Sequence, residues 1–120
     1  MNKQRKAMIK TEIDTLRAFR KAMRAEPTAP EAIAKALEES KARIVAIHDE
    51  EQDAFEKMSE KQQCSTAGEI AEESIALLED AIDYMDELVV DVKESDELDV
   101  NELGYGMEDA IDLLSDILNM

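Results

Sequence analysis

The chain has 120 residues, of which 44% are hydrophobic, and a formal net charge of -16 at pH 7. This length predicts one domain with a single core, the hydrophobic content excludes general disorder, and the lone Cys64 excludes an intramolecular disulfide. No apolar run approaches the roughly 20 residues of a membrane-spanning helix, and no hydrophobic signal segment follows the basic N-terminus, so we expect a cytoplasmic protein.

The first expected helix runs from about Lys3 to Ala25. It forms most of a basic segment that covers residues 1–26. Its first 24 residues hold eight Lys or Arg against two acids. Pro27 ends the helix, because the residue before a proline is pushed out of the helical region. Four bases recur every seven residues, at Lys3, Lys10, Arg17 and Arg24. Because aromatic residues are almost absent from this stripe, we interpret it as balancing acids of the same chain, or of a second copy in a homodimer, and do not expect nucleic acid as a partner.

The second expected helix follows directly, with Thr28 as its N-cap, Pro30 in the first turn and Glu31 closing a capping box. Apolar residues spaced by three and four form its seam: Ile33, Leu37, Ile44, Ile47, Ala54 and Met58. Ser40 and Glu51 interrupt that seam.

The third expected helix begins with Thr66 as cap and Glu69 as the partner in its capping box. An unbroken spacing of four and three defines its seam: Ala71, Ile75, Leu78, Ile82, Met85, Val89 and Val92. This pattern is typical of a helix packed lengthwise against another helix. The polar link Ser59–Ser65 is short, so residues 28–94 are predicted to form a long antiparallel helical hairpin.

Residues 95–120 are expected to form an acidic connector and a short final helix. The sequence predicts a capped turn from Asp99 that ends at Gly104, and then a helix from about Met107 to Leu118. No strand pattern is present. The fold class is therefore all-α, a small helical bundle forming a single domain over 1–120.

Acidic pairs on the two long helices resemble those of the all-α nucleotide pyrophosphohydrolases, which hold magnesium with such carboxylates. Glu50 and Glu51 would face Glu69 and Glu72 on the hairpin, and Mg²⁺ needs several converging carboxylates. With 30 acids in the chain such spacings arise often by chance, and no cluster of bases accompanies them to hold a triphosphate. A magnesium-dependent hydrolase is therefore kept only as an alternative.

Other candidate sites are weaker. The stretch Asp91–Glu102 has the ends of a calcium loop, but Lys93 and Asp96 stand where an oxygen ligand and glycine are needed. His48 and Cys64 could form a nucleophile pair, although no oxyanion hole accompanies them. We therefore predict no enzymatic activity, no metal site and no cofactor.

The acidic C-terminal half offers the candidate binding surface. From residue 66 to 120 there are 18 acids against one base, Lys93. The predicted partner-binding residues lie away from the apolar seams, and they are Glu72, Glu79, Asp80, Asp83, Asp86, Glu87, Asp91, Glu94, Asp109 and Asp112. A carboxylate on each turn, about 5.4 Å apart, is close to the spacing of phosphates along a strand. The face is interpreted either as a solvated surface that keeps the protein soluble or as a mimic of a nucleic-acid backbone.

Residues 48–88 resemble a widespread group of small acidic helical phage and prophage proteins. The matching positions are Asp49, Glu50, Glu51, Gln52, Ala54, Phe55, Met58, Glu60, Gln63, Ser65, Gly68 and Glu69. Ser59 and Gln62 stand where the group has Pro and Leu. The resemblance implies a phage origin and a helical hairpin, and it supplies no functional residues.

Small, acidic, helical phage proteins often resemble stoichiometric inhibitors of host nucleic-acid machinery, including anti-CRISPR and anti-restriction proteins. We therefore expect a non-enzymatic protein of the host cytoplasm that blocks a host protein with a basic nucleic-acid-binding surface. A phage structural or accessory protein that makes helical contacts is the first alternative, and the magnesium-dependent hydrolase is the second.

Overall fold

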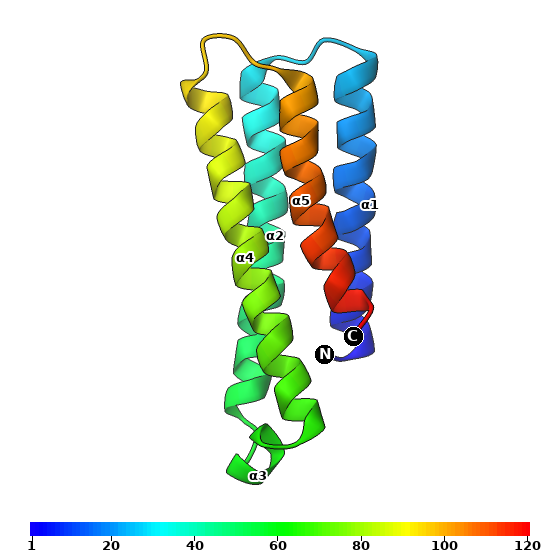
Figure 1. The fold of residues 1–120 in the computed structure, drawn as a ribbon, viewed down its shortest axis with the longest axis vertical. Helices are drawn as coiled ribbons and strands as arrows, with labels where there is room; N and C mark the ends of the chain where they lie inside the picture. Colours follow the sequence, from blue (N-terminus) through cyan, green and yellow to red (C-terminus); the bar gives the residue numbers. More distant parts are fainter.

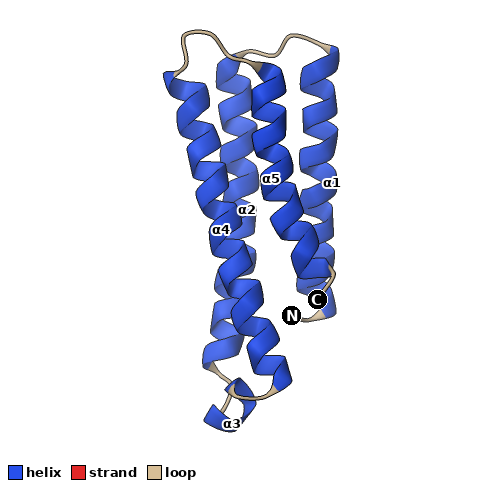
Figure 2. Cartoon of the chain, viewed as in Figure 1, coloured by secondary structure: helices blue, strands red, loops and turns tan.

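The computed structural model describes all residues from 1 to 120 as helices joined by short connections (Figures 1 and 2). The helices are α1 (Lys3–Ala25), α2 (Pro30–Glu56), α3 (Glu60–Gln63), α4 (Thr66–Glu94) and α5 (Val100–Leu118). No strand is present, which confirms the predicted all-α class.

The four long helices form an up-down-up-down bundle that measures 52 × 23 × 18 Å. Both α1 and α4 pack against α2 and α5, so α1 and α4 lie on opposite sides of the bundle (Figure 1). The predicted antiparallel hairpin is present as α2 and α4, and its tip with α3 extends beyond α1 and α5. No helix combines the length and apolar character that crossing a membrane requires.

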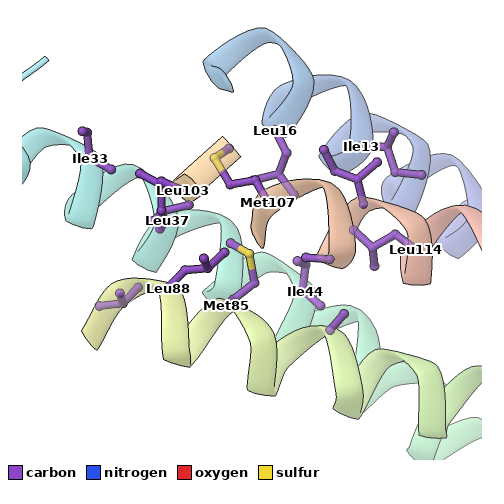
Figure 3. Close-up of a cluster of buried hydrophobic side chains, with 14 of the residues drawn as sticks. Ile13, Leu16, Ile33, Leu37, Ile44, Met85, Leu88, Leu103, Met107 and Leu114 are labelled. Carbon is purple, nitrogen blue, oxygen red and sulfur yellow. The ribbon is translucent and has the colours of Figure 1, made fainter. Parts of the chain in front are cut away.

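The core is built where the apolar faces of the four long helices meet. Leu16 of α1, Leu37 of α2, Met85 of α4 and Met107 of α5 are all at most 2% exposed, and side chains from all four helices enclose one another (Figure 3). Burying each such side chain is worth about 1.5–3 kcal/mol. The spacing of three and four therefore selects the face of each helix that turns inward.

Two predicted helix caps are wrong by one residue. Ala29 occupies the N-cap position of α2 and makes no side-chain cap, while the Thr28 hydroxyl donates to the Glu26 carbonyl. At α4 the N-cap is Ser65, whose hydroxyl oxygen accepts a hydrogen bond from the amide of Gly68. Ala29 and Ser65 have the extended backbone that an N-cap requires. The local sequence did not show that these residues, and not the adjacent Thr28 and Thr66, occupy the cap positions.

The link between the two hairpin helices is ordered by its own capping box. The Ser59 hydroxyl accepts from the amide of Gln62, and the Gln62 side chain accepts from the amide of Ser59, which starts the single turn α3. The side-chain amide of Gln63 donates to the carbonyls of Phe55 and Met58, at 3.1 and 3.3 Å. These bonds satisfy carbonyls at the end of α2 and hold the tip together.

The predicted end of a turn at Gly104 is wrong, because α5 is a single helix from Val100 to Leu118. Asp99 caps this helix as expected, accepting from the amides of Asn101 and Glu102. Gly104 lies inside the helix, where a Cβ atom would be 2.9 Å from the guanidinium of Arg24. The glycine thus provides close approach between α5 and α1, and it does not end the helix.

The interruptions in the seam of α2 are buried polar contacts with α1. Ser40 donates to the Glu12 carboxylate at 2.9 Å, and Arg43 donates to the same carboxylate at 2.7 Å. Further along, Arg5 pairs with Glu51 at 2.7 Å, with Glu51 only 2% exposed. Each buried carboxylate has a charged partner, which offsets the cost of removing it from water.

Candidate functional site

The predicted partner-binding acids share one property in the folded chain, which is solvent exposure. All ten are exposed on α4 and α5, namely Glu72, Glu79, Asp80, Asp83, Asp86, Glu87, Asp91, Glu94, Asp109 and Asp112. They point away from the apolar seams because those seams fill the core.

Two of the ten acids contact basic side chains of α2. Glu79 contacts His48 at 3.0 Å, and Asp86 forms an ion pair with Lys41. The other eight lie more than 4.0 Å from any base. Neutralisation is therefore confined to the edge of α4 that faces α2, and the rest of the acidic surface carries its full charge.

A groove of about 700 Å³ lies between the C-terminal half of α4, the connector and the first half of α5. Seven of its fourteen lining residues are acidic, and no base lines it: Glu87, Asp91, Glu94, Glu97, Asp99, Glu102 and Asp109. A shallower hollow formed by Asp80, Asp83, Tyr84 and Glu87 continues it along α4. We call these two hollows together the acidic groove.

Two tyrosines line the acidic groove. Tyr84 on α4 is 41% exposed and Tyr105 on α5 is 69% exposed, and they are the only tyrosines in the chain. A tyrosine face attracts a Lys or Arg side chain, and the surrounding carboxylates attract the same charge. The sequence interpretation missed both residues. The position of Tyr84 off the apolar seam of its helix was a usable signal, whereas Tyr105 fell in the predicted connector.

The carboxylates beside the groove form two regular columns. On α4, Asp80, Glu87 and Glu94 recur every seven residues, and on α5 Glu102 and Asp109 do the same, with Asp116 continuing the series. Seven residues of helix rise about 10.5 Å, so each column extends about 21 Å. Because α4 and α5 are antiparallel neighbours, the columns run side by side along the acidic groove.

The basic residues of α1 do not neutralise this groove. Arg20 pairs with Glu108 of α5 and Arg5 pairs with Glu51 of α2, and neither acid lines the groove. The other α1 bases make no ion pair, and most of them are exposed: Lys3, Lys10, Arg17, Lys21 and Arg24. The molecule therefore presents a basic face along α1 and a separate acidic groove between α4 and α5.

The carboxylates considered for magnesium do not converge. Glu51 points toward α1 and pairs with Arg5, whereas Glu50, Glu69 and Glu72 are exposed. No three Asp, Glu, His or Cys side chains are close enough together to hold one metal ion. In the stretch considered for calcium, Asp99 instead caps α5.

His48 and Cys64 belong to different regions. The ring of His48 lies between Asp49 at 3.1 Å and Glu79 at 3.0 Å, bridging α2 to α4. Burial lowers the pKa of His48, but hydrogen bonds to both carboxylates outweigh that effect, so the pKa is raised above its ordinary 6.5. Cys64 is exposed at the end of α3, at the hairpin tip. His48 therefore links α2 to α4, and Cys64 takes no part in this contact.

Comparison with known protein families, curated proteins and solved structures finds no match to this chain.

Proposed function

We propose that this chain is a non-enzymatic interaction protein that binds a host protein at its basic nucleic-acid-binding surface and blocks that surface. The observation that carries the proposal is the acidic groove, in which nine carboxylates and two exposed tyrosines occur without a base. Such a surface repels nucleic acid and anionic membranes, and attracts a surface of Lys and Arg.

The geometry of the groove favours partners that bind phosphate. Its carboxylates follow two rigid helices, so their negative charges are ordered in rows as phosphates are along a strand. A nucleic-acid-binding protein already has its Lys and Arg arranged for such rows, and little reorganisation is needed to bind. Arginine side chains that stack on nucleic-acid bases would stack equally on Tyr84 and Tyr105.

The resemblance of residues 48–88 to phage proteins supports a host target concerned with nucleic acids or with defence. An inhibitor made during infection has to act stoichiometrically, and electrostatic steering speeds its encounter with a basic target. An anti-CRISPR or anti-restriction role fits this requirement, and it forms part of the proposal.

The test is affinity capture from a bacterial lysate followed by elution with nucleic acid. The immobilised protein is washed with duplex DNA or single-stranded RNA, and the released proteins are identified by mass spectrometry. A groove variant, Asp83→Asn with Glu87→Gln and Asp91→Asn, should capture at least tenfold less of the nucleic-acid-eluted proteins. The control variant, Glu26→Gln with Glu39→Gln and Glu50→Gln, makes the same change in charge at exposed positions outside the groove.

Equal recovery by the two variants would show that general negative charge, and not the groove, retains the proteins, and the proposal would then fail. Release of pyrophosphate from a nucleotide in the presence of Mg²⁺, with its loss on Glu50→Gln, would support the hydrolase alternative. The structural or accessory alternative is favoured by a different observation, the unneutralised basic face of α1.

A further inference from the structure

The basic face of α1 matches the acidic groove in spacing. Lys3, Lys10 and Arg17 are exposed, make no ion pair and recur every seven residues, so they extend about 21 Å along α1. The carboxylate column of Asp80, Glu87 and Glu94 has the same interval and the same length. Two helices with such columns align charge against charge over three successive positions.

Lys10 and Arg17 do not reach the acidic groove of their own molecule. They line a hollow with Ser115, Leu118 and Asn119 at the C-terminal end of α5, whereas the groove lies along the first half of α5 and along α4, across the bundle from α1 (Figure 1). Arg5 and Arg20 are the only bases of α1 that form ion pairs with other helices. Lys3, Lys10 and Arg17 therefore have no ion pair in their own molecule and can bind a second one.

We propose that α1 of one copy docks in the acidic groove of a second copy, giving a head-to-tail assembly. Lys10 and Arg17 would lie between the two carboxylate columns, with Tyr84 and Tyr105 against their side chains. Because each copy carries one basic face and one acidic groove, the contact is heterologous and every copy has two neighbours. The partner in this inference is the chain itself, so it does not depend on the proposed host target.

The charges predict how this contact responds to salt. Whole copies repel each other because each carries a net charge of -16, and this repulsion acts over distances longer than an ion pair. At about 0.15 M salt the Debye length is about 8 Å, so the long-range repulsion is largely screened while contacting pairs still attract. At about 1 M salt the contacts are also screened, and the assembly should dissociate.

A charge exchange tests the contact. The α1 variant carries Lys10→Glu and Arg17→Glu. A second variant, called the lysine groove variant to distinguish it from the groove variant above, carries Glu87→Lys and Asp109→Lys. All four positions are exposed. In sedimentation velocity at 0.15 M NaCl, the wild-type weight-average mass should rise with concentration above the 13.5 kDa monomer. Each variant alone should stay at the monomer mass, because its substituted side chains would face like charges across the contact.

An equimolar mixture of the two variants should associate again, because the lysine groove variant keeps the wild-type α1 and the α1 variant keeps the wild-type groove. The substituted α1 and the substituted groove also place Glu opposite Lys. The mixture has the same mean net charge as the wild type, so recovery cannot come from overall charge. The control, Lys35→Glu with Lys61→Glu, changes net charge as the α1 variant does but lies on α2 and α3, and it should associate like the wild type.

A second measurement does not rely on the variants. Zero-length carbodiimide crosslinking of mixed ¹⁴N and ¹⁵N wild-type protein should give mixed-isotope peptides that join Lys3 or Lys10 to Glu87 or Asp109. A wild type that stays monomeric at every concentration, a mixture that does not recover, or a lack of mixed-isotope crosslinks between α1 and the groove would each overturn the inference. Any of these results leaves capture of a host protein by the groove unaffected.

Discussion

At the scale of single residues, the polar side chains inside the bundle hold particular pairs of helices together. Glu12 with Ser40 and Glu51 with Arg5 connect α1 to α2, and His48 connects α2 to α4 through Glu79. Replacing such pairs by apolar residues is often tolerated, whereas removing one partner leaves a buried charge unpaired. These contacts therefore define which helices are neighbours, while the apolar seams supply most of the stabilisation.

His48 predicts a pH dependence of stability whose direction follows from its pKa. The folded-state pKa lies above the ordinary 6.5, so protonation favours the folded state. This contribution is fully present below pH 6.5 and is lost as the pH rises through the folded-state pKa. His48→Gln should remove it, so the difference in urea midpoint between wild type and variant should shrink as the pH is raised from about 5.5 to 8.5. A difference that stays constant over this range would contradict the assigned role.

At the scale of elements, the hairpin tip explains several polar residues and a glycine in the stretch 48–88. Ser65 caps α4, Gln63 caps the end of α2, and Gly68 lies where α3 and α4 approach most closely. A Cβ at Gly68 would be well inside van der Waals contact with the backbone carbonyls of Gln62 and Gln63. These positions therefore serve the turn between the helices.

Two glycine substitutions should have opposite effects. Gly68→Ala should destabilise the protein by about 1–3 kcal/mol, because backbone atoms of the tip would have to move. Gly104→Ala should be neutral or stabilising by up to about 1 kcal/mol, because only the flexible Arg24 guanidinium has to shift and alanine favours the helix. Urea unfolding of both variants measures the contrast, and equal effects would show that the tip is not closely packed.

At the scale of the whole molecule, the unpaired bases lie along α1 and the acids gather on α4 and α5. The groove carboxylates repel each other along α4, where Asp83, Glu87 and Asp91 are spaced by four residues. Like charges at this spacing cost about 0.2–0.5 kcal/mol for each pair. The acidic surface therefore lowers the free energy of unfolding.

The groove variant used to test the proposed function should accordingly be more stable than the wild type. Asp83→Asn with Glu87→Gln and Asp91→Asn removes two repulsive pairs, and a gain of about 0.5–1 kcal/mol is expected at low salt. Thermal melts in 20 mM and 300 mM NaCl should show a higher Tm and a weaker response to salt. A lower Tm would mean that these carboxylates stabilise the fold, and loss of binding could then no longer be assigned to the groove.

The sequence by itself determined three of the four long helices, the inward faces and the exposure of all ten predicted acids. Proline stops and the spacing of apolar residues are local signals, so α1, the hairpin and the seam through Leu78 and Met85 were predictable. Only the tertiary structure decided why Gly104 lies inside α5, why Glu51 is buried against Arg5, and that Tyr84 and Tyr105 share one groove. Each of these depends on which helices are adjacent, and adjacency arises from contacts between residues far apart in the chain.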